Sequence, residues 1–238
     1  MNARPAFGHE SAKGMQAGPT LTVCYIPVPA MEHEVSSHPK TRITSQEYLA
    51  LERKTEVKRE YLDGEMFAMS GATREHTRIV TNMTVELGNQ FADRPCELYP
   101  MDMRTKVLAT GLYAYPDISA LCGQAEFEDD QFDTLTNPQL IIEVLSESTE
   151  SYDRGKKFAH YRTIPSLRED ILVSQSECRI ERFVRQDDDT WLYSESADPN
   201  GSIELTSVAC RLFLARVYHK VDFGRVKASA DEDQPPAE

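Results

Sequence analysis

One carboxylate of this 238-residue chain stands in a sequence that is too apolar to suit a charge. Glu143 interrupts the run LIIEVL at 140–145, whose length and β-branched residues are typical of a strand buried on both faces. A charge inside such a strand costs several kcal/mol unless it is paired or bound to a metal. Either a cation meets Glu143, or its side chain points outward from an edge strand.

A second carboxylate, Asp117, follows Pro116 where another apolar strand is expected to begin. If this strand neighbours the one with Glu143, both carboxylates project from one side of the sheet. Two close carboxylates repel, and the pKa of one rises unless a cation lies between them. A divalent cation with oxygen ligands would remove the repulsion. The alternative is that Asp117 only caps the end of its strand.

A lysine, Lys157, lies in a predicted helix four residues after Asp153 and four before Tyr161. This spacing places the three side chains on neighbouring turns. The ammonium can then lie between the buried and the solvated faces of the helix. The alternative is that Lys157 extends into solvent and pairs with Asp153 alone.

The elements that position these residues follow from local patterns. A capping box at Thr44–Glu47 and an Asp63-Gly64 turn mark a helix start and a hairpin. Helices are predicted at 44–53, 73–91, 152–162 and 208–217. Strands are predicted at 57–62, 65–69, 96–99, 103–108, 115–121, 139–145, 170–173, 179–184 and 191–193. This order predicts a mixed α/β domain with a central sheet.

Composition sets the boundaries of that domain. Forty per cent of the residues are hydrophobic, which excludes global disorder, and no run is apolar enough to span a membrane. Residues 1–40 are expected to form a disordered leader, 41–227 the folded domain, and 228–238 a disordered acidic tail. No signal peptide is expected.

The net charge of −13 argues at first against a nucleic-acid partner. Twelve of these charges, however, lie in three segments, at 124–133, 187–189 and 228–238. The remainder is close to neutral, and exposed charge is screened beyond about 8 Å. The charge therefore does not exclude DNA as a substrate.

Five cysteines are scattered singly along the chain, and no two of them have the spacing of a metal-binding pair. We therefore expect reduced thiols and a cytoplasmic protein.

Taken together, these residues resemble the core of the PD-(D/E)XK nuclease superfamily, with Pro116-Asp117 followed by Glu143-Val144-Leu145. More narrowly, residues 41 to about 185 resemble the Uma family of restriction endonucleases. The matching stretches are 60–65, His76, 115–117, 137–149 and 153–161. The superfamily's lysine would stand at position 145, where this chain has leucine. In the resembling family a helix lysine takes its place, and Lys157 fits that position. Two further departures are Glu147, where the family usually has proline, and Ser174, where it commonly has aspartate.

The resemblance implies a restriction-endonuclease-like core, in which helices flank a central mixed β-sheet. It also implies a magnesium-dependent endodeoxyribonuclease, with manganese as the second choice of metal. Asp117, Glu143 and the backbone carbonyl of Val144 would hold the metal, and Lys157 would orient a water or stabilise the charged transition state. The accessory candidates are Glu60, His76, Asp153 and Tyr161. The expected partner is DNA, no membrane is involved, and a homodimer is compatible with the superfamily.

Two other functions stay open from the sequence. One is a catalytically inactive nuclease fold that binds nucleic acid. The other is an interaction protein that uses the acidic loop 124–133 as a docking surface. The sequence lacks a phosphate-binding loop of the Walker type, a dinucleotide-binding fingerprint, a zinc-protease motif and a serine-hydrolase motif.

Overall fold

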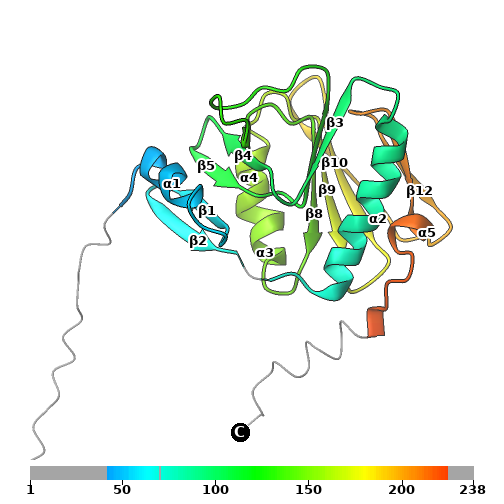
Figure 1. The fold of residues 1–238 in the computed structure, drawn as a ribbon. Helices are drawn as coiled ribbons and strands as arrows, with labels where there is room; N and C mark the ends of the chain where they lie inside the picture. Colours follow the sequence, from blue (N-terminus) through cyan, green and yellow to red (C-terminus); the bar gives the residue numbers. More distant parts are fainter. Residues whose placement is uncertain (1–41, 70, 225–238) are drawn as a thin grey trace, which may run out of the picture. The chain divides into compact units, whose positions relative to one another are not determined.

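The computed structural model describes residues 42–69 and 71–224 (Figure 1). The leader predicted at 1–40 and the tail predicted at 228–238 lie outside these residues. The helices are α1 (Ser45–Glu52), α2 (Arg74–Phe91), α3 (Glu150–Tyr152), the π-helical η1 (Asp153–Lys157), α4 (Phe158–Tyr161) and α5 (Leu214–Val217). The strands are β1 (Arg59–Leu62), β2 (Glu65–Ala68), β3 (Cys96–Pro100), β4 (Arg104–Val107), β5 (Leu112–Ala114), β6 (Ile118–Cys122), β7 (Thr134–Leu135), β8 (Leu140–Leu145), β9 (Glu169–Ser174), β10 (Ile180–Arg185), β11 (Trp191–Ser196), β12 (Ser202–Leu205) and β13 (Cys210–Phe213).

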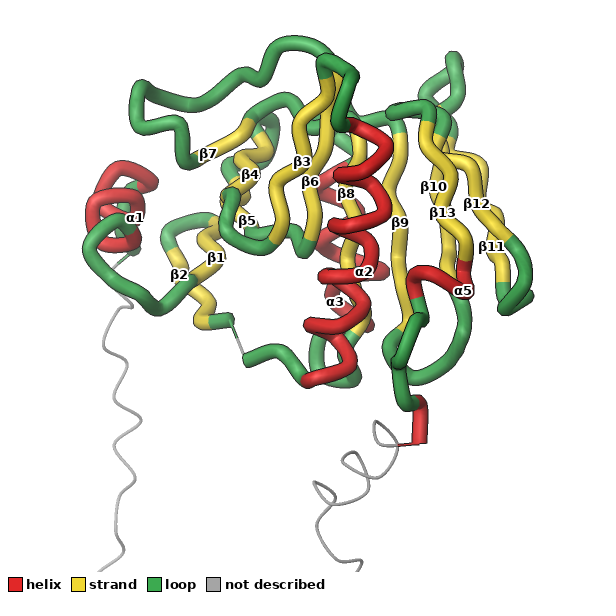
Figure 2. Tube along the Cα trace, turned by 45° about the vertical axis from the view of Figure 1, so that its right-hand side comes forward, coloured by secondary structure: helices red, strands yellow, loops and turns green. Residues whose placement is uncertain are grey.

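The strands form two larger sheets and one hairpin, whereas a single central sheet was expected from the sequence. One sheet has six strands in the order β11-β10-β9-β8-β6-β3, and β8 and β9 run parallel in its middle. The other has five strands in the order β2-β1-β5-β4-β7. The tube view shows them as separate groups of strands, with β12 and β13 beside the six-stranded sheet (Figure 2). The fold is therefore mixed α/β with mixed sheets, and its helices are few.

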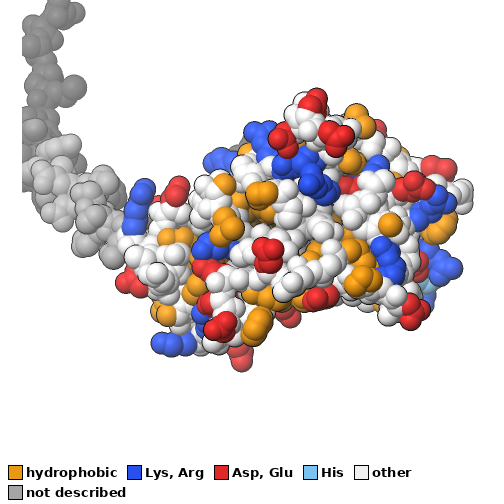
Figure 3. Space-filling view, turned by 90° about the horizontal axis from the view of Figure 1, so that it is seen from above, with side chains coloured by type: hydrophobic (Ala, Val, Ile, Leu, Met, Phe, Trp, Pro, Cys, Tyr) orange, Lys and Arg blue, Asp and Glu red, His pale blue; other side chains and the backbone are white. Residues whose placement is uncertain are grey.

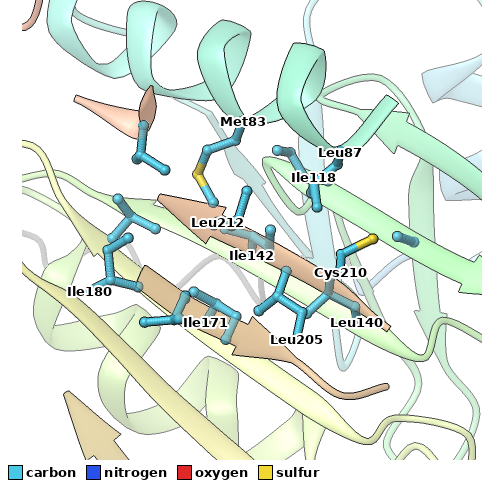
Figure 4. Packing of buried hydrophobic residues seen from close by; sticks show 14 of the residues in the cluster. Met83, Leu87, Ile118, Leu140, Ile142, Ile171, Ile180, Leu205, Cys210 and Leu212 are labelled. Carbon is cyan, nitrogen blue, oxygen red and sulfur yellow. The ribbon is translucent and has the colours of Figure 1, made fainter. Parts of the chain in front are cut away.

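The central strand β8 is buried along its whole length, as its apolar sequence predicts. Leu140, Ile142 and Val144 belong to the larger core cluster, which includes Met83 and Leu87 of α2. The close-up shows Met83 and Leu87 of α2 facing the layer of strands that carries Leu140 and Ile142 (Figure 4). Because successive side chains of a strand point to opposite faces, Ile141 and Glu143 face the other side, where Ile141 packs with Tyr161 of α4.

Local sequence signals predict several elements correctly. Thr44 caps α1 in a complete capping box with Glu47. Asp63 and Gly64 both have positive φ angles, 50° and 86°, as the tight turn between β1 and β2 requires. Helix α2 begins after its cap residue Thr73, and the apolar face predicted for it is buried.

The helix predicted at 208–217 is wrong over most of its length. Residues 210–213 form strand β13, which pairs antiparallel with β12, and only Leu214–Val217 are helical. The burial along β13 alternates, with Cys210 and Leu212 buried and Arg211 and Phe213 exposed. This period of two belongs to a strand with one buried face. Strands β5, β7 and β12 were also not predicted; β5 has three residues and β7 has two.

The expectation that the thiols are all reduced is wrong for two cysteines. Cys96 and Cys122 stand opposite each other on the antiparallel strands β3 and β6, and a disulfide joins them. Cys178 and Cys210 are free. The pairing depends on the register of β3 against β6, which the sequence alone does not reveal for two cysteines 26 positions apart.

Three acidic residues of the loop at 124–133 form ion pairs with basic residues of the same chain, so this part of the loop is already engaged. Asp129 and Asp133 both lie 2.8 Å from the guanidinium of Arg53. Glu128 lies 2.6 Å from the Lys106 ammonium, and Asp133 also pairs with Arg104. Within the described ranges, no helix is both long and apolar enough to cross a membrane.

Candidate active site

The structure brings the two predicted carboxylates together beside the end of β6. The backbone N–H of Val144 donates to Oδ2 of Asp117 across 2.7 Å, and the Asp117 N–H lies 3.4 Å from Oε2 of Glu143. Asp117 directly precedes β6, which pairs antiparallel with β8. The neighbouring strands that the sequence left as a condition are therefore present, and Asp117 lies directly before one of them.

Lys157 is buried among three carboxylates rather than extended into solvent. Its Nζ lies 3.0 Å from Oε1 of Glu60, 3.0 Å from Oε1 of Glu143 and 3.5 Å from Oδ1 of Asp153. Its side chain is 7% exposed. The sequence left open whether Lys157 pairs with Asp153 alone. The structure shows that Lys157 also pairs with Glu143 of β8 and with Glu60 of β1.

A π-helical turn places Lys157 in this position. The N–H of Phe158 donates to the carbonyl of Asp153, five residues earlier, as in a π-helix. A continuous α-helix was expected at 152–162, but residues 153–157 form a π-helical turn instead. Asp153 and Lys157 are both buried in this turn, while Gly155 and Lys156 are exposed. The turn thus directs the side chains of Asp153 and Lys157 toward β8.

The other accessory residues predicted from the sequence also reach the cluster. The Tyr161 hydroxyl donates to Oε1 of Glu143 across 2.9 Å. Nε2 of His76 lies 3.1 Å from Oδ2 of Asp117. The backbone N–H of His76 is bonded to the cap residue Thr73, so the first turn of α2 fixes where the imidazole stands.

Burial dominates the electrostatics of this cluster. Desolvation raises the pKa of Glu143 well above its ordinary value; Lys157 opposes this shift, and the negative charges of Asp153 and Asp117 add to it. Burial also raises the pKa of Asp153. For Lys157, burial favours the neutral amine, but Glu143, Glu60 and Asp153 together raise its pKa well above the ordinary value. The three carboxylates therefore keep the Lys157 side chain protonated.

The cluster carries more negative than positive charge. Four carboxylates, those of Glu60, Asp117, Glu143 and Asp153, stand with one ammonium. No group of three or more His, Cys, Asp or Glu side chains with metal-binding geometry occurs in residues 42–69 and 71–224.

One buried acid near the cluster was missed by sequence reasoning. Asp170 of β9 is 1% exposed, and neither of its carboxylate oxygens has a hydrogen-bond partner among the described residues. Its register partner on β8 is Ile141, so it shares the sheet face of Glu143. Desolvation raises the pKa of Asp170 to about 8, although the charge of Lys157 partly opposes the shift. The signal that identified Glu143, an acid against an apolar run, was present here too.

Comparisons with known proteins agree with one another. Residues 45–214 match the Uma2 family model, which is described as "Putative restriction endonuclease". The chain is 35% identical to the uncharacterized protein sll1609 of Synechocystis over 69% of this chain and 93% of that protein. It is 32% identical to the uncharacterized protein slr1290 of the same organism over 79% and 97% of the two chains.

A solved structure shares the fold. It is a crystal structure from Anabaena variabilis described as a "putative nuclease belonging to DUF820". The TM-score is 0.61 at 18% identity, and the match covers 77% of this chain and 99% of that one. Because the family model spans well over half of the sequence, the chain belongs to the Uma2 family.

Proposed function

We propose that this protein is a metal-dependent endonuclease that hydrolyses phosphodiester bonds in DNA, with a restriction-endonuclease-like core. The observation that carries the proposal is the buried cluster in which Asp117 and Glu143 meet beside Lys157. Family membership supports the reaction class. The excess of negative charge supports a bound divalent cation. Burial is the main cause of the raised pKa of Glu143, and a cation would relieve the repulsion from Asp153 and Asp117 that adds to it.

Asp117 and Glu143 are the proposed metal ligands, and Val144 adds its carbonyl. In a strand, the N–H and C=O of one residue point to the same side. The N–H of Val144 points at Asp117, so its carbonyl faces that side too. Magnesium favours such hard oxygen ligands, and manganese accepts them as well. When bound, the metal would lower the pKa of a water and neutralise charge on the phosphate.

The remaining side chains have proposed roles that follow from their contacts. Lys157 would orient the attacking water or stabilise the negative charge of the transition state. Glu60 and Asp153 hold its ammonium in place, and Tyr161 orients Glu143 by donating to Oε1. His76 contacts Asp117 through Nε2 and would fix its carboxylate.

The direct test is cleavage of single- and double-stranded DNA by the purified full chain with Mg²⁺ or Mn²⁺. We expect Glu143→Gln and Asp117→Asn each to lower the rate at least 100-fold, because both remove a negative ligand without changing the shape of the side chain. Glu147→Gln is the matched control, since Glu147 is exposed and lies three residues after Val144. Circular dichroism would show that the variants fold.

The proposal fails if the wild type does not cut, or if Glu143→Gln and Asp117→Asn cut as fast as Glu147→Gln. Salt-dependent DNA binding without metal-dependent cleavage would instead identify an inactive nuclease fold.

A further inference from the structure

A second charged site lies at the other end of the helical segment that carries Lys157. A cavity of about 630 Å³ opens there. Its wall includes Arg162, which follows α4, Arg168, which precedes β9, and Trp191, which begins β11. Arg162 stands five residues after Lys157, about 7.5 Å along a helix axis. The cavity and the acidic cluster thus share one helical segment.

The guanidinium of Arg185 forms the inner wall of this cavity. Its side chain is 9% exposed and lies over the Trp191 ring, 4.9 Å from the centroid. Nη2 donates to the carbonyl of Ile164 across 2.9 Å, and Nη1 lies 3.2 Å from Asp189. Its Nε is buried and has no hydrogen-bond partner among the described residues. The wall therefore holds a desolvated cation with an unmet donor.

Two further arginines stand at the rim with their charges uncompensated. Arg162 and Arg168 are exposed, and neither has an ion-pair partner in the described part of the chain. With Arg185 and Asp189 the cavity carries a net charge of +2, in a chain whose net charge is −13. Figure 3 shows, on the face seen from above, Lys and Arg side chains gathered in one area next to a group of acidic side chains.

The chemistry of this cavity fits phosphate groups flanked by flat apolar rings. Guanidinium groups bind phosphate oxygens through paired, charge-assisted hydrogen bonds. An indole presents an apolar surface to a sugar or a base. We propose that Arg162, Arg168 and Arg185, with Trp191, bind the phosphate backbone of the nucleic acid on which the acidic cluster acts. This inference rests on the proposed function and adds a place where the substrate strand is held.

Asp189 occupies the position of a competing anion in this site. Its carboxylate pairs with Arg185 and is 83% exposed. A phosphate must displace it or share the guanidinium with it. Removal of the Asp189 charge should therefore strengthen phosphate binding at this site.

The experiment measures binding of a single-stranded 12-mer of thymidylate to the full chain in EDTA, where a metal-dependent nuclease cannot cut. Trp191 is the single tryptophan of the chain, so its fluorescence reports on this cavity directly. We expect a saturable change in that fluorescence. The double variant Arg162→Ala/Arg168→Ala should bind at least 10-fold more weakly, with a salt slope lower by about 1.4. Asp189→Asn should bind two- to threefold more tightly.

The control is Arg216→Ala, because Arg216 is 68% exposed on α5 and its replacement removes one of the two positive charges that the double variant loses. The inference is overturned if the double variant binds as the wild type does, or if Arg216→Ala weakens binding equally. It is also overturned if inorganic phosphate alone, at the same phosphate concentration, reproduces the fluorescence change.

Failure of the inference and failure of the proposed function can be told apart. If the wild type cuts DNA but the Arg162→Ala/Arg168→Ala variant binds DNA as tightly as the wild type does, only the inference is overturned. Binding that depends on them, without metal-dependent cleavage, would support the inference and overturn the nuclease proposal.

Discussion

Lys157 is the residue on which the candidate site depends most. It is the cation shared by Glu60, Glu143 and Asp153, and all four side chains are buried. Removal of one partner of a buried ion pair leaves the others uncompensated, which typically costs about 3–5 kcal/mol. The lysine therefore has a structural role in addition to the catalytic role that we propose.

We expect Lys157→Met to lower the free energy of unfolding by about 3 kcal/mol and to abolish cleavage. Urea denaturation and the DNA assay would measure the two effects. Lys156→Met is the control, since Lys156 is exposed and precedes Lys157 directly. Equal unfolding midpoints for the two variants would show that Lys157 does not hold the cluster, and loss of cleavage only in Lys156→Met would transfer the catalytic role to its neighbour.

Asp170 makes the stability of the protein depend on pH. Its pKa in the fold is about 8 because it is desolvated, whereas an unfolded aspartate titrates near pH 4. Between these values the folded state keeps a proton that the unfolded state loses. The contribution of Asp170 to stability is therefore complete below about pH 4 and declines as the pH rises to about 8.

We expect Asp170→Asn to remove this decline. The variant should resemble the wild type near pH 4 and be more stable at pH 8, by an amount on the order of 2–5 kcal/mol. Urea midpoints from pH 4 to pH 9 would measure the difference between the two proteins. Asp93→Asn, at an exposed position, should leave the pH profile unchanged. Parallel profiles for Asp170→Asn and the wild type would contradict a raised pKa.

At the scale of the elements, two glycines show where local geometry constrains the chain. Gly64 has a φ of +86° in the hairpin that carries Glu60, and a Cβ there would lie 2.7 Å from Cβ of Arg42. Gly155 lies in the π-helical turn, where a Cβ would meet nothing within 4 Å. The hairpin thus needs its glycine, and the π-helical turn does not.

We expect Gly64→Ala to destabilise the protein by about 1–2 kcal/mol, since alanine at positive φ is strained. Gly155→Ala should stabilise it by about 0.5–1 kcal/mol, because glycine has a low propensity for helical backbone. Chemical denaturation of both variants beside the wild type would measure these changes. A destabilising Gly155→Ala would mean that the π-helical turn requires glycine after all.

The disulfide between β3 and β6 ties the outer strand of the six-stranded sheet to its neighbour. A cross-link over 26 residues restricts the unfolded chain, which is worth about 3 kcal/mol. Reduction should therefore lower the melting temperature of the wild type, and calorimetry with and without a phosphine reductant would show it. The same reductant should leave Cys96→Ser/Cys122→Ser unchanged, while Cys178→Ser should respond as the wild type does. An unchanged melting temperature of the wild type after reduction would contradict the disulfide.

At the scale of the whole molecule, the metal binding that we propose would be linked to folding. A ligand that binds only the folded state stabilises it by about 1.4 kcal/mol at ten times its Kd. We expect Mg²⁺ or Mn²⁺ to raise the melting temperature by a few degrees. Asp117→Asn should lose this increase, and Asp93→Asn should keep it. An equal increase in both variants would show that the metal binds elsewhere.

The sequence by itself predicted the features that depend on near neighbours. The capping box of α1, the Asp63-Gly64 turn and the buried face of α2 each follow from hydrogen bonds or periodicity within a few residues. The family resemblance named Asp117, Glu143 and Lys157, and their catalytic roles stay predictions.

Only the tertiary structure decided what depends on distant contacts. It showed that Glu60 pairs with Lys157 and that Cys96 is bonded to Cys122. It also showed that the buried carboxylate of Asp170 has no hydrogen-bond partner among the described residues. It also showed that residues 210–213 pair as a strand with β12. Each of these features depends on strand register or on the packing of a helix against a sheet. The free energy that selects them comes from burial and pairing between separated segments, which local sequence patterns do not encode.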